Sequence, residues 1–248
     1  MQPAMFPHDL NLAAPSNFRD LAAPVRPQVA LRWRTLFRSD HLGALSDEDA
    51  RKIQSLGVRR VIDFRGERER LSAACALPDV RVHALTIEPT IVQVLSDLIA
   101  AGQRLTPADV VGHMQETYRG FVQDNTPRFR EFFGLLLESD EPTVFHCTAG
   151  KDRTGFAAAL VLHALGATQA QIMDDYLLTN QRLRRPPGAG MGLAPEVAAA
   201  LWGVQVEFLQ AAFEAVDREH GSLDAYLRKG LGLGPAEHQR LRALYLQA

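Results

Sequence analysis

The chain has 248 residues with a formal net charge of −2, and 46% of them are hydrophobic, so it can fill a sizeable core and lacks the basic excess typical of nucleic-acid binding. Its two cysteines are too few for a disulfide-stabilised scaffold and suit a reducing compartment. Neither a signal-peptide pattern nor an apolar stretch of membrane-spanning length is evident, so we expect a cytoplasmic protein without a stable membrane anchor, with secretion by a signal-independent route left open.

The first third of the chain predicts strands that alternate with a helix. Residues 29–37 are rich in side chains that favour strands. Ser46 followed by three acidic residues is typical of a helix start, and this helix should end near Gly57. Residues 58–64 and 80–85 predict the next two strands.

A long helical region follows, and it leads into one more strand. Apolar periodicity predicts helices at residues 90–101, 107–123 and 126–137. The β-branched and aromatic stretch at 143–145 predicts a short buried strand, and the apolar run at 156–165 predicts the helix after it.

The last third of the chain is predicted to be helical. Thr168 is a suitable cap for a helix that reaches toward residue 179, and the Pro- and Gly-rich residues 186–192 predict a loop. Three further helices are expected at residues 194–217, 223–231 and 235–246. The whole pattern predicts a single α/β domain over residues 1–248, with a central, largely parallel sheet flanked by helices and a helical C-terminal part.

One run, VFHCTAGKDRTG at residues 144–155, has the form of a loop that holds phosphate against a thiolate. Cys147 stands where the predicted strand ends, and Arg153 stands where the next helix begins. Unpaired N–H groups and the positive end of the helix dipole favour an oxyanion at such a place. The residues expected to surround the phosphate are Thr148, Ala149, Gly150, Lys151, Asp152 and Arg153.

The side chains of this loop suit phosphoryl transfer. Gly150 permits a tight turn, and the planar guanidinium of Arg153 can donate to two phosphate oxygens at once. The positive surroundings favour the thiolate of Cys147, which makes it the candidate nucleophile. Thr154 can direct its hydroxyl at the sulfur, and His146 is expected to orient the loop rather than to transfer a proton.

Other kinds of site fit the loop less well. A Walker A nucleotide loop requires Ser or Thr after Lys151, where Asp152 stands. Neither cysteine has a partner at zinc-ligand spacing, so we expect no metal and no cofactor. Two alternatives stay open: a phosphoprotein-binding module without turnover, which has no need of a nucleophile, and a sulfur-transfer enzyme with a similar loop.

The loop resembles the signature of the cysteine-dependent protein-tyrosine phosphatases, and CTAGKDRTG at 147–155 is similar to that of a bacterial group within them. Similarity to this group also covers residues 17–21, 36–39, 61–65 with Glu67, 174–178 and 221–233. The resemblance implies a protein-tyrosine-phosphatase-like fold and hydrolysis of phosphomonoesters through a phosphocysteine intermediate. It implies substrates among phosphotyrosine proteins, phosphoserine or phosphothreonine proteins and phosphoinositides.

Two aspartates are candidates for the general acid that protonates the leaving alcohol. Asp63 is expected at the carboxyl end of a strand, where α/β sheets bind their ligands, and the resemblance favours it; it can also brace a loop. Asp152 lies inside the phosphate loop, where it can act as the acid or position Lys151 or a water molecule.

Two further features bear on the substrate. Lys151 adds a second cation to the loop, which would attract the extra phosphates of an inositol ring or else only strengthen the local positive field. The apolar helices within residues 88–123 need a covering surface. By resemblance they form a helical lid over the site, and the alternative is a pair of helices packed on the core.

Overall fold

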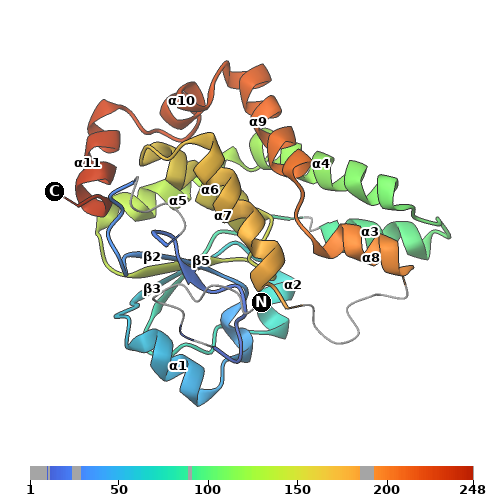
Figure 1. Cartoon of the computed structure of the whole chain (residues 1–248), viewed down its shortest axis with the longest axis horizontal. Helices are drawn as coiled ribbons and strands as arrows, with labels where there is room; N and C mark the ends of the chain where they lie inside the picture. Colours follow the sequence, from blue (N-terminus) through green and yellow to red (C-terminus); the bar gives the residue numbers. More distant parts are fainter. Residues whose placement is uncertain (1–9, 11, 24–28, 89–90, 185–192, 248) are drawn as a thin grey trace.

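The computed structural model describes residues 10, 12–23, 29–88, 91–184 and 193–247 (Figure 1). In this part of the chain one sheet has the strand order β1-β2-β5-β3-β4. Its strands are β1 (Arg19–Asp20), β2 (Leu36–Ser39), β3 (Arg60–Asp63), β4 (Arg81–Ala84) and β5 (Thr143–His146). Only β1 is antiparallel to its neighbour, and the other pairs are parallel. The predicted α/β architecture with a largely parallel sheet is confirmed.

The register of the sheet brings three strand ends to one level. His146, the last residue of β5, pairs with Ser39 of β2 on one side and with Asp63 of β3 on the other. Cys147 is therefore the first residue beyond the carboxyl edge at the centre of the sheet. This is the edge at which open α/β sheets bind ligands.

Alternate residues of the central strands face two different cores. In β5, Val144 packs in a smaller core with Ile53 of α1 (Asp47–Gln54), and Phe145 packs in the larger core with Phe132 of α5 (Thr126–Glu138). Figure 1 shows α1 on one face of the sheet and α5, α6 and α7 on the other. The larger core extends under the long helical region, so both faces of the sheet are covered.

Most predicted helices are present close to their expected limits. Ser46 and Thr168 cap α1 and α7 by accepting hydrogen bonds from the backbone N–H of Asp49 and Gln171. The confirmed helices are α3 (Ile91–Ala100), α4 (Pro107–Gln123), α5, α6 (Arg153–Ala164), α7 (Gln169–Arg182) and α11 (Pro235–Tyr245). None of the helices in the described ranges has the length and hydropathy needed to cross a membrane.

Some sequence predictions were wrong. Residues 29–35 do not form a strand, because Arg34 turns the chain with a φ of 62° and β2 starts only at Leu36. The helix expected at 194–217 is two helices, α8 (Pro195–Trp202) and α9 (Val206–His220), because Gly203 adopts an extended backbone. The segment expected as one helix at 223–231 consists of α10 (Leu223–Ala225) and a π-helical turn, η2 (Tyr226–Gly230).

Three short elements were not predicted, namely β1, η1 (Leu42–Ala44) and α2 (Glu67–Ser72). Elements of two to six residues carry too little periodicity to be recognised from sequence. The loop expected at residues 186–192 lies outside the described residues.

Candidate active site

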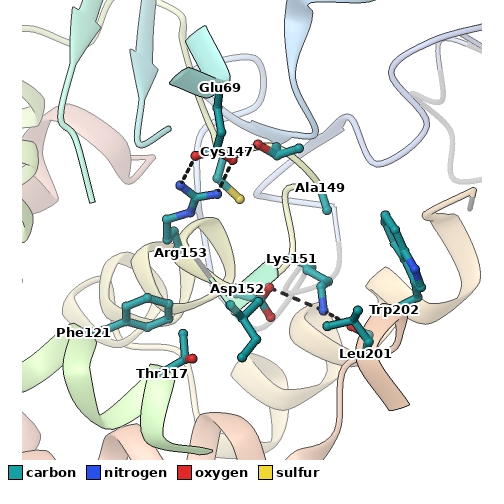
Figure 2. Close-up of a pocket in the computed structure, with 12 residues that line it drawn as sticks. Glu69, Thr117, Phe121, Cys147, Ala149, Lys151, Asp152, Arg153, Leu201 and Trp202 are labelled. Carbon is teal, nitrogen blue, oxygen red and sulfur yellow. Dashed lines mark hydrogen bonds and ion pairs between the residues drawn. The ribbon is translucent and has the colours of Figure 1, made fainter. Parts of the chain in front are cut away.

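The loop between β5 and α6 forms the floor of a cavity of about 240 Å³. Its walls come from the loop, from α2 and from helices α3, α4 and α8 (Figure 2). The loop residues in the wall are Cys147, Thr148, Ala149, Lys151, Asp152 and Arg153. The other lining residues are Glu69, Ile91, Thr117, Phe121, Leu201 and Trp202. Of the residues singled out in the sequence, His146, Gly150, Thr154 and Asp63 do not line it.

Gly150 is the point at which the loop turns. Its φ is +65°, and a Cβ at this position would lie 2.2 Å from the carbonyl oxygen of Ser39. Both the left-handed backbone and the close approach of β2 require a residue without a side chain. The loop can therefore fold tightly against the end of β2.

A buried polar network holds the outside of this turn. Asn17 Nδ2 donates to the carbonyl oxygens of Ala149, at 3.1 Å, and Gly150, at 3.0 Å. Arg38 Nη2 donates to the Gly150 carbonyl at 2.8 Å, and Asp175 binds the Arg38 guanidinium in turn. These contacts provide hydrogen-bond donors for the carbonyl groups of the turn. Asn17, Arg38 and Asp175 belong to three of the segments that resemble the phosphatase group, and support of this turn is a structural reason for that resemblance.

Arg153 is held by a carboxylate that the sequence did not single out. Glu69 of α2 forms two parallel ion-pair contacts with the guanidinium, Nη1 to Oε2 at 2.8 Å and Nη2 to Oε1 at 2.9 Å (Figure 2). Burial would raise the pKa of Glu69, but the hydrogen bonds and charge of Arg153 outweigh it and hold the pKa at about 2. Glu69 is therefore ionised at neutral pH and fixes the orientation of Arg153.

A sequence signal for Glu69 existed in the helix start. Its carboxylate accepts a hydrogen bond from the backbone N–H of Gly66, three residues earlier, at 2.8 Å. A Gly followed three residues later by Glu is a weak form of the capping-box pattern. Glu67, which the sequence segment contained, is exposed instead.

Lys151 and Asp152 both line the cavity but have different partners. The ammonium of Lys151 donates to the carbonyl oxygens of Leu201, at 2.6 Å, and Gly203, at 3.3 Å, where α8 ends. It also lies 3.4 Å from Oδ2 of Asp152. The other oxygen of Asp152 accepts a hydrogen bond from the hydroxyl of Tyr118, at 3.1 Å.

Asp63 lies at the end of β3, as expected, but its carboxylate is bound within the protein. Arg65 contacts it through Nη2, 2.7 Å from Oδ2, and through Nε, 3.0 Å from Oδ1. Burial acts to raise the pKa of Asp63, but the net shift is downward, and the side-chain hydrogen bonds from Arg65 are the largest cause of the lowering. The side chain is 1% exposed, so Asp63 is a buried, ionised partner of Arg65.

His146 and Thr154 lie beneath the loop. The imidazole of His146 donates from Nδ1 to the carbonyl oxygen of Cys147 at 2.9 Å, and burial lowers its pKa to about 4. It is therefore neutral at neutral pH. The hydroxyl of Thr154 is buried and has no hydrogen-bond partner among the described residues, so its expected contact with the sulfur is not formed here.

Comparison with known proteins agrees with the resemblance of the loop to tyrosine phosphatases and extends it over nearly the whole chain. The model of the tyrosine phosphatase family matches residues 10–247. The chain belongs to this family. A putative tyrosine-protein phosphatase of Cupriavidus necator is 37% identical over 96% of this chain and 89% of that protein. The triple specificity protein phosphatase PtpB of Mycobacterium tuberculosis is 30% identical over 93% of this chain and 96% of PtpB. This member of the tyrosine phosphatase family is thus an enzyme, a phosphatase, as the loop predicted.

Proposed function

We propose that this enzyme hydrolyses phosphotyrosine in proteins with Cys147 as the nucleophile. The observation that carries the proposal is that a cysteine, an oriented arginine and an aspartate meet in the wall of one cavity. The thiolate of Cys147 attacks phosphorus, a bond forms between sulfur and phosphorus, and the bond between phosphorus and the tyrosine oxygen breaks. Water then attacks the phosphocysteine, releases inorganic phosphate and restores the thiolate.

Asp152 is the proposed general acid for the first step. It lines the cavity beside Cys147 and Arg153, whereas Asp63 does not line the cavity and is paired with Arg65. A group that protonates the leaving oxygen must reach it. We assign Asp63 the bracing role that the sequence left open. Asp152→Asn should lower turnover of esters with poor leaving groups far more than turnover of activated aryl phosphates, while Asp63→Asn should lower both equally.

We infer that the enzyme prefers an aromatic phosphate ester from the apolar residues that line the cavity. Ile91, Phe121 and Trp202 line the same cavity as the loop and present apolar surface to a substrate that enters it. A phenyl ring gains from burial against such a wall, and the short alkyl chain of phosphoserine gains less. We therefore place phosphotyrosine first and phosphoserine or phosphothreonine second.

Phosphoinositide hydrolysis is the extension that depends on Lys151. PtpB is named a triple specificity phosphatase, and a cation in the cavity wall favours substrates with additional phosphates. The carbonyl groups that bind Lys151 carry no net charge, and the neighbouring carboxyl of Asp152 does not cancel the charge of Lys151 while it holds the acid proton. Lys151→Met should lower the ratio of phosphoinositide to phosphotyrosine turnover, and an unchanged ratio would remove this extension.

The proposed lid is narrowed to α3. Val110, Met114 and Phe121 of α4 are buried in the larger core, which ties this helix to the body of the protein along most of its length. Ile91, at the start of α3, both lines the cavity and packs on the core. If α3 is a lid, its amides exchange faster than those of α6 in the free enzyme and slow down when vanadate binds. If the amides of α3 exchange at the same rate in the free and the vanadate-bound enzyme, α3 is a helix that packs on the core and not a lid.

The two cysteines provide a direct test of the mechanism. Cys147→Ser should abolish release of inorganic phosphate from an aryl phosphate while the protein still binds phosphate. Cys75→Ser is the matched control, because Cys75 packs against the smaller core and does not line the cavity, so its loss should leave turnover near the wild-type value. Continued turnover by Cys147→Ser would overturn the mechanism. A wild-type enzyme that binds phosphotyrosine without turnover would instead support the phosphoprotein-binding module.

A further inference from the structure

Two buried tyrosines lie directly behind Asp152. Tyr118 comes from α4 and Tyr176 from α7, and neither side chain is more than 1% exposed. Their hydroxyl oxygens are 2.7 Å apart, and the Tyr118 hydroxyl is 3.1 Å from Oδ1 of Asp152. Three residues that are far apart in the sequence thus form one hydrogen-bonded chain that ends at the phosphate loop.

The direction of this chain follows from the number of available protons. Burial, followed by the neighbouring charges of the site, raises the pKa of both tyrosines well above the usual value, so each keeps its single hydroxyl proton at any usable pH. Tyr118 uses its proton to donate to Asp152. The hydrogen bond between the two hydroxyls must therefore be donated by Tyr176, which orients the Tyr118 hydroxyl toward the carboxylate.

The two oxygens of Asp152 consequently have different surroundings. Oδ1 accepts from Tyr118, and Oδ2 lies 3.4 Å from the ammonium of Lys151, itself a residue of the cavity wall. A proton on Oδ1 would compete with the Tyr118 donor, whereas a proton on Oδ2 leaves that hydrogen bond intact.

We propose that Tyr118, oriented by Tyr176, is a positioning residue that fixes the Asp152 carboxyl and keeps its acid proton on Oδ2, where the leaving oxygen of the ester collects it. The proposal rests on the proposed role of Asp152 as general acid. In the catalysed step the proton moves from Oδ2 to the tyrosine oxygen as the bond from that oxygen to phosphorus breaks. Asp152 becomes a carboxylate, which Tyr118 stabilises through Oδ1.

A purely structural role predicts something different for the same residues. Buried tyrosine hydroxyls need a partner, and these two already have each other. If the pair served only the core, loss of one hydroxyl would lower the stability of the fold and affect all substrates alike. Positioning of an acid instead affects a substrate in proportion to how much its leaving group needs a proton.

The test compares single hydroxyl deletions on two substrates, a phosphotyrosine peptide with a poor leaving group and an activated nitrophenyl phosphate. Tyr118→Phe should lower kcat for the peptide about 10-fold and change kcat for the activated ester much less. Tyr176→Phe should also lower kcat for the peptide more than kcat for the activated ester, with a smaller loss than Tyr118→Phe. Tyr226→Phe is the matched control, because it removes a buried hydroxyl that binds Thr126, outside the cavity wall.

A double variant that carries both Tyr118→Phe and Asp152→Asn distinguishes an error in the positioning role of Tyr118 from an error in the assignment of Asp152 as general acid. In the Asp152→Asn background, Tyr118→Phe should cause no further leaving-group-dependent loss. If Asp152→Asn alone affects both substrates equally, the assignment of the acid is wrong. If Asp152→Asn discriminates between the substrates but Tyr118→Phe does not, only the positioning role is overturned. Should Tyr118→Phe fail to fold, the result for Tyr176→Phe decides in the same way.

Discussion

The guanidinium of Arg153 and the carboxylate of Glu69 face each other edge to edge, with contacts of 2.8 and 2.9 Å. The same carboxylate accepts hydrogen bonds from the Thr148 hydroxyl and from the backbone N–H of Gly66. One side chain of a six-residue helix therefore ties α2 to both ends of the phosphate loop. Removal of its charge should disturb the loop without removing any group that touches the reacting atoms.

Glu69→Gln keeps the size of the side chain, but its amide oxygen can accept only one of the two hydrogen bonds from Arg153, without charge assistance, and its NH2 group faces the other donor. We expect kcat/KM for an aryl phosphate to fall about 10- to 100-fold, because charge-assisted bonds contribute more than neutral ones and Arg153 loses its fixed orientation. Steady-state kinetics and vanadate inhibition measure the effect. Glu67→Gln, an exposed change on the same helix, is the control, and equal activity of both variants would contradict the positioning role of Glu69.

Gly150→Ala should damage the loop for two independent reasons. The new Cβ would lie 2.2 Å from the Ser39 carbonyl oxygen, and φ would remain at +65°. We expect a loss of about 2–4 kcal/mol in the free energy of unfolding and at least a 100-fold loss of turnover. Gly134→Ala in α5, where a Cβ meets no atom within 4 Å, should instead stabilise the protein by about 0.5–1 kcal/mol. Urea denaturation of both variants tests the contrast.

Lys151→Met should loosen α8 from the phosphate loop. The ammonium binds carbonyl oxygens at the C-terminal end of that helix, where a cation is favoured by the helix dipole. Hydrogen exchange within Pro195–Trp202 should become faster, while exchange within α6 stays the same. Lys52→Met removes a partly exposed lysine paired with Glu48 in α1 and should affect neither helix. Unchanged exchange in α8 would show that the hydrogen bonds from Lys151 contribute little to the stability of this helix.

His146 should make the stability of the protein depend on pH. Its folded-state pKa is lowered from 6.5 to about 4, so between these values the unfolded chain binds more protons than the folded one. Stability from this source is complete above about pH 6.5 and falls as the pH drops toward 4. His146→Asn keeps a donor for the Cys147 carbonyl but does not titrate. The free energy of unfolding of this variant should therefore change less between pH 7.5 and pH 5 than that of the wild type, and an equal change would refute the assignment.

Contiguous features of the chain could be predicted from sequence, because their geometry depends on neighbours along the backbone. Cys147 and Arg153 are separated by one turn of loop, so a strand before them and a helix after them bring both to the same place. The fold class followed from the alternation of predicted strands and helices, and the phosphatase family followed from the resemblance of the loop and several other segments; both are confirmed. At Gly203 the local pattern is misleading, because apolar periodicity continues across this residue although α8 ends at Trp202 and α9 begins at Val206.

Features that depend on packing between distant segments were missed. Asp63 is an exception, because a local contact was overlooked: it was expected in the site because it ends a strand, but residues two apart on an extended chain point to the same side, and Arg65 binds its carboxylate. Tyr118 and Tyr176 show the converse. Each has the spacing of an ordinary core residue in its helix, and only the contact between α4 and α7 places their hydroxyls in line with Asp152.

Trp202, at the end of α8, gives the enzyme a built-in optical probe. Its indole lines the cavity, and the chain contains only two tryptophans. With Trp33 replaced by Phe, all tryptophan fluorescence would come from this one ring, whose surroundings change when a phosphate ester enters. The helix end that Lys151 ties to the loop thereby reports occupancy in real time, without a label.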